Sequence, residues 1–420
     1  MDLRRVETLP QYVFSRIDDL KAQAAAGGAD VIDFGIGSPD LPTPATVVDR
    51  LVREAREPRN HGYPTSAGIP EVREALAAWY ERHHGVVLDA VTQTLVTWGV
   101  SEALAHLPWV LLGPGDTALV PEPCYPIHRY AVQFSGAEPL PLRMWSDRSF
   151  ELAVELEQAW EEATTKPRVV LLSFPHNPTT RCVELADFER LVAFARERDL
   201  AIVHDFAYGD IAFDGYRPPS ILQVPGAADV AVELVSLSKS HNMAGWRLGF
   251  VAGNAAVVAG LARLKSYLDY GVTGAVQLMA LTALEEGDDV PAQMAATYQD
   301  RRDLLCDGLT ACGWPVARPR GTMFVWARIP PAFRPMGSLA FAELLVREAG
   351  VAVSPGIGFT AGPDEGGGTW ADEHVRFALV QPRERAGAAL KKIGRVLAKG
   401  PPTAPAPSSS AASIPREESP

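Results

Sequence analysis

The sequence predicts an α/β protein that has a large domain with a mostly parallel, seven-stranded sheet and a smaller α+β domain. Two observations lead to this prediction. Short apolar runs without polar alternation recur between residues 94 and 253, as expected for strands that are covered on both faces. Helix-like stretches such as 101–112 and 185–198 lie between several of these runs, and this alternation is typical of a parallel sheet.

Seven apolar runs are the candidate strands of this sheet. They are residues 94–99, 116–121, 138–142, 168–174, 200–205, 232–238 and 247–253. Beyond about residue 295 the pattern changes to a charged helix over 298–313 and then to shorter stretches, which indicates the second domain. These strand-like or helical stretches are 323–329, 339–350, 351–355 and 374–380.

The chain is expected to have four parts. An N-terminal segment covers 1–45, the large domain 46–295, the small C-terminal domain 296–398 and a tail 399–420. The tail is rich in Pro, Ala and Ser and cannot form a core, so we predict that it is disordered.

The composition favours a globular protein with a small-molecule partner. A formal net charge of −12 argues against a nucleic-acid or anionic-membrane partner, because both attract basic patches. The four cysteines form no C-x-x-C pair, so neither a metal site nor a disulfide framework is predicted. The N-terminus has no apolar stretch of signal-peptide length, and no later run reaches membrane-spanning length without Gly, Pro or charge. We therefore expect a cytoplasmic protein.

One lysine, Lys239, lies among serines at the end of an apolar run in "SLSKSHNMAGWRLGF", with Arg247 eight residues later. A solvated lysine is the ordinary interpretation of such a position. A partly desolvated pocket with a second cation would instead favour the neutral amine, which attacks aldehydes to form a Schiff base. The obvious aldehyde cofactor is pyridoxal 5'-phosphate.

Taken together, the motifs resemble the class I and II aminotransferases of pyridoxal-phosphate fold type I, and within them the bacterial alanine (glutamate-pyruvate) aminotransferases. The resemblance runs from "LPQYVF" near the N-terminus to "LKKI" near residue 393. It implies that the large domain binds pyridoxal 5'-phosphate and that the N-terminal segment packs with the small domain.

The resemblance assigns cofactor contacts to particular residues. Ser236 and Arg247 would hold the phosphate, which suits the oxyanion-binding fork of arginine. In "VHDFAY", Asp205 would pair with the pyridine nitrogen and Tyr208 would donate to the phenolic oxygen. Both follow a predicted strand, where ligand sites of open α/β sheets collect. Asn177 in "SFPHNPTTRC" would donate to the same ring oxygen and contact the substrate, and the proline after it indicates a sharp turn with a cis bond.

Two stretches depart from the family pattern. Thr180 stands where glycine is usual in the N-P-T-G turn. In "TWGVSEALAHL", which resembles the phosphate-binding turn, Val100 and Ser101 replace the serine and lysine of the usual G-S-K-E. Backbone amides at a helix N-terminus can still bind phosphate there, although one side-chain hydroxyl is lost.

Four further residues have roles implied by the resemblance. Tyr125 would stack on the cofactor ring, and Tyr63 would reach the phosphate of a neighbouring subunit, which implies a homodimer. Arg376 would grip the substrate α-carboxylate, and the backbone of Gly37 would approach the substrate closely. The ordinary interpretations are a core tyrosine at 125 and a surface arginine at 376.

These assignments predict a ping-pong aminotransferase in which Lys239 moves the proton from the substrate Cα. Small or apolar residues in "IGSPD", "CYPIH" and "GTMFVW", with no arginine dedicated to a second carboxylate, favour the methyl group of alanine. The resemblance to the glutamate-pyruvate enzymes implies alanine and glutamate as donors and pyruvate and 2-oxoglutarate as acceptors. Alternatives are an aminotransferase of another amino acid, a C–S lyase or an amine-oxidising relative. A cofactor-sensing regulator is disfavoured, because no basic helix-turn-helix segment precedes residue 30.

Overall fold

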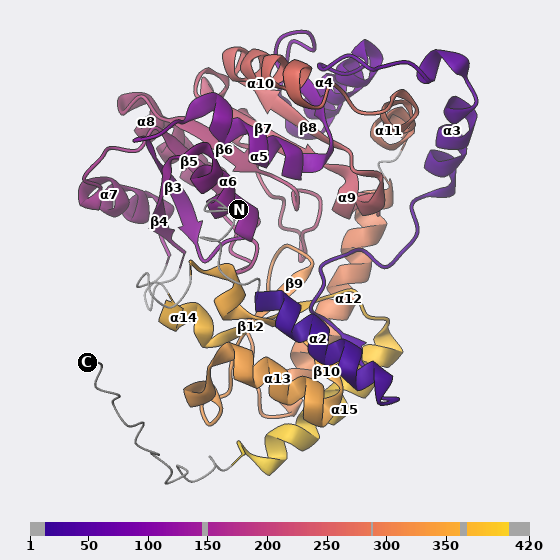
Figure 1. Ribbon diagram of the computed structural model, residues 1–420, viewed down its shortest axis with the longest axis vertical. Coiled ribbons are helices and arrows are strands. Elements are labelled where there is room, and N and C mark those ends of the chain that lie inside the picture. Colours follow the sequence, from indigo (N-terminus) through magenta and orange to yellow (C-terminus); the bar gives the residue numbers. More distant parts are fainter. Residues whose placement is uncertain (1–12, 145–149, 287–288, 362–367, 403–420) are drawn as a thin grey trace, which may run out of the picture.

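A seven-stranded sheet lies at the centre of the larger part of the molecule (Figure 1). The computed structural model describes residues 13–144, 150–286, 289–361 and 368–402. The strands are β2 (Thr94–Thr97), β3 (Thr117–Glu122), β4 (Glu138–Arg143), β5 (Val169–Ser173), β6 (Ala201–Asp205), β7 (Ala231–Ser236) and β8 (Gly249–Gly253). They are ordered β2-β8-β7-β6-β5-β3-β4, and only the pairs that involve β8 are antiparallel. The predicted mostly parallel sheet is confirmed.

Helices cover both faces of this sheet, as the unbroken apolar strands predict. One core contains Leu172, Ile202 and Phe250 with residues of α4, α7, α8 and α11. The other contains Leu171 and Val203 with residues of α5, α6 and α10. The helices of this part are α3 (Ala45–Ala55), α4 (Pro70–His84), α5 (Gly99–Leu111), α6 (Pro126–Ser135), α7 (Leu152–Glu162), α8 (Leu185–Glu197), α9 (Leu237–Ser240), α10 (Ala255–Leu268) and α11 (Gly274–Glu286). Short 3-10 turns are Pro58–Asn60, Ile221–Gln223, Ala227–Asp229 and Ala244–Trp246.

The later residues form a smaller part with its own core, seen at the bottom of Figure 1. Its elements are α12 (Asp289–Ala311), β9 (Phe324–Arg328), α13 (Gly337–Ala349), β10 (Val351–Ala352), β11 (Ser354–Pro355), α14 (Gly368–Asp372), β12 (His374–Ala378) and α15 (Arg383–Lys399), with 3-10 turns at Arg334–Met336 and Gly356–Phe359. Strands β11, β12 and β9 form an antiparallel sheet. This agrees with the α+β pattern expected there.

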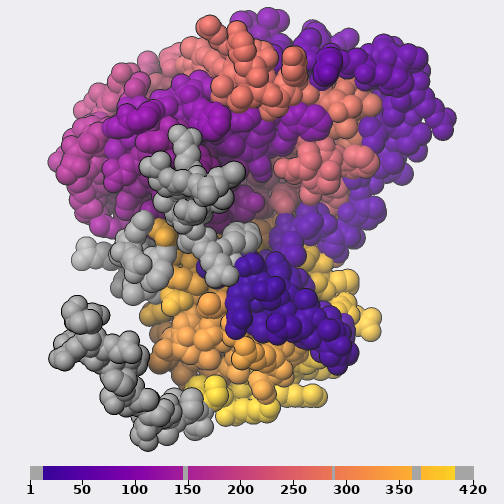
Figure 2. Space-filling model, in the orientation of Figure 1, coloured from indigo at the N-terminus to yellow at the C-terminus, as the bar shows by residue number. Residues whose placement is uncertain are grey.

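The first described residues belong to the same smaller part. Helix α2 (Val13–Ala26) packs against α13, and β1 (Ile32–Asp33) pairs in parallel with β10. In Figure 2 the surface of this indigo segment lies directly on the orange surface of later residues.

The charged helix expected over 298–313 begins earlier in the structure, because α12 starts at Asp289. The expected boundary at 295/296 therefore falls inside a continuous helix, and the division of the chain into four segments stays a prediction. Most of the expected tail, residues 403–420, lies outside the described residues. Across the described ranges, no helix combines the length and apolarity needed to cross a membrane.

Candidate active site

All of the predicted site residues except Tyr63 line one cavity of about 470 Å³, within the range typical of small-molecule sites. The predicted residues that line it are Gly37, Val100, Ser101, Tyr125, Asn177, Asp205, Tyr208, Ser236, Lys239, Arg247 and Arg376. Helix α2 and the smaller part supply further lining residues, including Lys21, Phe324 and Phe359. Tyr63 is not among the lining residues, and 92% of its surface is exposed.

Lys239 enters the cavity from the short helix that follows β7. Ser236 ends the strand and caps this helix, because its hydroxyl accepts the Ser238 N–H at 3.1 Å. The Lys239 Nζ donates to the carbonyl oxygen of Gly37 at 2.6 Å. Burial, together with the charges of Arg376 and Arg247, lowers the pKa of Lys239 to about 8. Neutral amine is therefore accessible near physiological pH, as expected for a nucleophile or a base.

This shift leads to a prediction for the protein freed of cofactor. Labelling of Lys239 by an amine-specific reagent should have a midpoint near pH 8. Below the midpoint the ammonium form dominates, and the rate should fall about tenfold per pH unit. Peptide mass spectrometry across a pH series measures this. Lys21 is the control: burial lowers its pKa, but its bonds to Asp18 and Asp33 raise it overall. A Lys239 midpoint near the ordinary lysine value of 10.5 would contradict the burial argument.

Asp205 ends β6 with its carboxylate held on both sides. One oxygen accepts from the Nε2 of His128 at 3.0 Å, and the other accepts the Ala207 N–H at 3.2 Å. His128 is fully buried and lies in the first turn of α6, the helix that Tyr125 precedes. The ring of Tyr125 meets the imidazole of His128 edge-on. Burial raises the pKa of Tyr208 far above its ordinary value, so its hydroxyl stays protonated and can donate. The sequence reasoning missed His128, although its place one turn after Tyr125 was a usable signal.

The start of α5 forms a cradle against Arg247. Gly99 has a φ of +71°, and a Cβ added there would lie 2.8 Å from the Arg247 guanidinium. A Cβ added at Gly249 would lie 2.6 Å from the Val100 amide nitrogen. Glycine therefore allows the arginine and β8 to approach the first amides of the helix, and such amides with a guanidinium suit a phosphate. The turn keeps this shape although Val100 and Ser101 depart from the family pattern.

Asn177 lies in a tight turn after β5. The Asn177–Pro178 peptide bond is cis, as the sequence indicated, and the Thr180 N–H donates to the carbonyl of His176 at 2.8 Å. Thr180 adopts a φ of +60°, the left-handed conformation that glycine usually provides, so the substituted turn is retained. The Asn177 Oδ1 accepts from Arg376 at 2.7 Å, which leaves the amide nitrogen as the donor of this side chain.

Arg376 lies on β12, and its guanidinium is held by Gly35, two residues after β1, and by the Phe324 ring. Its Nη2 donates to the carbonyl oxygen of Gly35 at 3.1 Å, and its Cζ lies 4.0 Å from the centre of the Phe324 ring. A Cβ added at Gly37 would come within 2.7 Å of that same ring, so only glycine fits. The fork is therefore held in one orientation for a planar anion such as a carboxylate.

These residues fit pyridoxal 5'-phosphate from end to end. The cradle of Gly99 and Arg247 suits its phosphate, the anchored Asp205 suits a protonated ring nitrogen, and the buried Lys239 suits its aldehyde.

Comparison with known proteins agrees with this geometry. The family described as aminotransferase class I and II matches residues 29–392. The glutamate-pyruvate aminotransferase AlaC of Escherichia coli (strain K12) is 47% identical over 389 residues, which cover 93% of this chain and 92% of that protein. An LL-diaminopimelate aminotransferase of Syntrophobacter fumaroxidans is 41% identical, with 93% and 98% covered. The structure of a probable N-succinyldiaminopimelate aminotransferase from Thermus thermophilus is similar with a TM-score of 0.83 and 35% identity, covering 91% of this chain and 100% of that one.

Proposed function

The chain belongs to the class I and II aminotransferases, which depend on pyridoxal 5'-phosphate, and from this we propose that it moves amino groups among alanine, glutamate, pyruvate and 2-oxoglutarate. The observation that most supports amino-group transfer is the presence of a buried, easily deprotonated Lys239 and the fixed guanidinium of Arg376 in one cavity. The Escherichia coli relative is a glutamate-pyruvate aminotransferase, which supports the same substrates.

The proposed roles follow from the positions of these residues in the cavity. When bound, pyridoxal phosphate supplies an aldehyde that takes up the amino group and a ring that accepts electrons from the substrate Cα. Arg376 binds the substrate α-carboxylate and thereby orients the Cα–H bond. Lys239, once its amine is free, would take the proton from the substrate Cα and deliver it to the carbon of the cofactor's aldehyde group. Asp205 keeps the ring nitrogen protonated, and Tyr208 and Asn177 donate to the ring oxygen.

The cavity wall supports a small side chain with room for a second carboxylate at one edge. Ile36, Val353 and Phe359 give it apolar surface, which suits the methyl group of alanine. On α2, Lys21 also lines the cavity and pairs with Asp18 at 2.6 Å and Asp33 at 2.7 Å. We assign the distal carboxylate of glutamate to the third N–H of Lys21, which these two contacts do not use.

Replacement of Lys21 tests this assignment. Lys21→Met should raise KM for glutamate and 2-oxoglutarate by about tenfold, the size of a partly exposed charge contact, and leave KM for alanine and pyruvate within about twofold. Steady-state kinetics with each substrate measures both. Arg16→Met is the matched control, because Arg16 is a cation on the same helix that pairs with Glu343 outside the cavity lining. Equal changes for all four substrates would exclude Lys21 as the distal contact.

A second candidate substrate is LL-diaminopimelate, which carries an ammonium and a carboxylate at its far end. The carboxylate of Asp18 and the ammonium of Lys21 line the cavity side by side and have the complementary charges. Relatives named as LL-diaminopimelate aminotransferases are 38–41% identical to this chain. A panel of amino donors, each assayed with 2-oxoglutarate, separates the two: the proposal expects alanine to exceed diaminopimelate in kcat/KM, and the opposite order would reassign the substrate.

We also propose a homodimer in the cytoplasm. Tyr63, Tyr267 and Tyr270 expose 92%, 81% and 53% of their surfaces, and the rings of Tyr63 and Tyr270 lie 5.5 Å apart. Such an aromatic group on a surface is typical of an interface. Sedimentation should show twice the chain mass of 45.3 kDa, and Tyr267→Glu should shift the protein toward monomer with lower activity. Val154→Glu, at an exposed apolar residue of α7, should not. A fully active monomer would exclude the shared site implied for Tyr63.

A further inference from the structure

We propose that Glu102 is a positioning residue for the phosphate-binding turn at the start of α5, and that Lys265 holds Glu102 in place from behind. The inference rests on the proposed phosphate site at Gly99, Val100 and Ser101. Neither Glu102 nor Lys265 is among the residues that line the cavity.

The Glu102 carboxylate fixes the backbone at the start of the phosphate-binding turn. Its Oε2 accepts the backbone N–H of Trp98 at 2.6 Å, and Trp98 is the residue that precedes the first helical residue, Gly99. Backbone N–H groups at a helix start have no partner within the helix, so a side chain that accepts one fixes the path of the chain there. The amides of the next residues are thereby presented to the cavity in one arrangement.

Lys265 on α10 fixes the carboxylate in turn. Its side chain is fully buried, and its Nζ lies 2.8 Å from both oxygens of Glu102 and 3.3 Å from Asp269. The Nδ1 of His106, one turn further along α5, lies 3.1 Å from the Oε1 of Glu102. Burial alone would raise the pKa of Glu102, but its bonds to His106 and Lys265 lower it overall, so the group is anionic. A buried ammonium stays in place only when it is paired, so Lys265 and Glu102 restrain each other.

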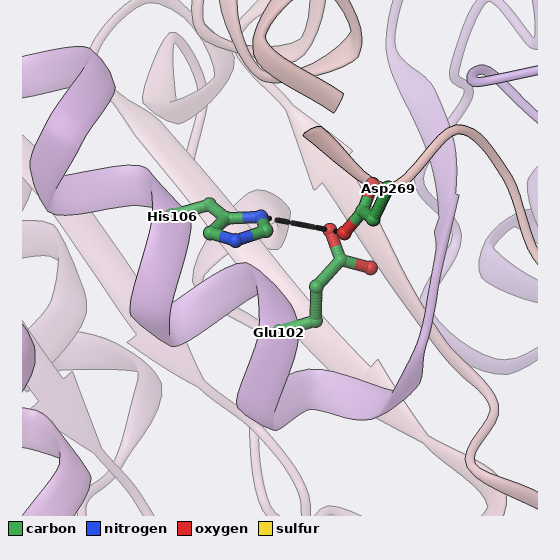
Figure 3. A group of neighbouring side chains, drawn as sticks. All are labelled: Glu102, His106 and Asp269. Carbon is green, nitrogen blue, oxygen red and sulfur yellow. Dashed lines mark hydrogen bonds and ion pairs between the residues drawn. The ribbon is translucent and has the colours of Figure 1, made fainter. Parts of the chain in front are cut away.

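The same residues do not argue for a metal. Glu102, His106 and Asp269 approach one another closely enough to share an ion (Figure 3). However, the ammonium of Lys265 already contacts both Glu102 oxygens, which supplies the positive charge that an ion would bring.

Charge balance gives the arrangement a second role. An unpaired carboxylate in the first turn of α5 would repel a phosphate bound at the same helix end and would compete for the helix dipole. Lys265 lies at contact distance from Glu102 and offsets that charge, although it also has a longer contact with Asp269 at 3.3 Å. Glu102 can therefore anchor the turn with less repulsion of an anion bound in front of it.

The test compares two ligands that differ only in the phosphate. Full-length protein freed of cofactor is titrated with pyridoxal phosphate and with pyridoxal, which has the same ring and aldehyde, so the ratio of the two Kd values isolates the phosphate. Glu102→Ala should weaken pyridoxal phosphate by about tenfold or more and pyridoxal by less than about threefold. Glu102→Gln keeps an acceptor for the Trp98 N–H and should lie between Glu102→Ala and the wild type. Should Glu102→Ala fail to fold, the near-isosteric Lys265→Met should show the same phosphate-selective loss and Glu102→Gln a smaller one.

The control is a buried arginine away from the cavity, Arg302, whose partner Asp214 is half exposed. Arg302→Met removes the contact with Asp214 and should lower Tm without changing the ratio of the two Kd values. Equal losses for both ligands in the Glu102 variants, or no loss, would overturn the positioning role. A wild-type protein that binds both ligands equally would instead overturn the proposed phosphate site itself.

Discussion

The Lys239→Ala protein is expected to show no measurable turnover, a loss of at least about 10⁴-fold, because the group that carries the proton and meets the aldehyde is gone. Among the described residues that line the cavity there is one other lysine, Lys21, but its bonds to two carboxylates keep it protonated and therefore unreactive. Steady-state kinetics measures the loss. Borohydride reduction followed by peptide mass spectrometry should locate the cofactor on Lys239 in the wild-type protein.

Lys21→Met serves as the control for the reduction experiment, since the labelled site should not change. A Lys239→Ala protein that is still labelled within the same cavity and remains fully active would disprove the assignment.

Replacing Asp205 by alanine should lower kcat by about a thousandfold while part of the cofactor stays bound. The Asp205 carboxylate stabilises the protonated ring nitrogen, and this stabilisation matters most in the transition state, when electrons move from the substrate Cα into the ring. The phosphate cradle around Arg247 does not depend on Asp205, so part of the cofactor should still bind. Kinetics and cofactor titration of the same preparation separate the two effects. Asp205→Asn keeps the shape without the charge and should lose nearly as much. A rate within a few-fold of the wild type, about 1 kcal/mol or less, would remove Asp205 from this role.

The sheet could be predicted from sequence because its strands are buried on both faces. Runs such as 168–174 and 200–205 contain little that could face water, and each appears as a strand within one or two residues of its predicted ends. The two-residue strand β1 carries no such pattern. It exists because β10 offers it backbone partners, which is a property of the tertiary structure and not of the segment.

The site was predictable only where a motif carried it. Three distant stretches contribute Asn177, Asp205 and Arg376. Only the resemblance of these stretches to the motifs of a family predicts that the three residues share one site. The bond between Asn177 and Arg376 could not be foreseen, because it depends on how the smaller part sits against the sheet. Lys265 could not be predicted for a different reason: a lysine in a helical pattern is usually solvated, and the pairing of this one with Glu102 depends on the neighbouring helix α5.

The pairing of β1 with β10 has a consequence for how the protein is made. Arg376 donates to Gly35, 341 residues earlier in the chain, so the substrate pocket is formed by segments that are far apart in the sequence. During synthesis, the first strand must wait without its partner until the smaller part has emerged, and such long-range closure is slow. A chain that stops before β12 has no carboxylate anchor, and one that stops before β10 also leaves the edge of β1 unpaired and open to association with other chains.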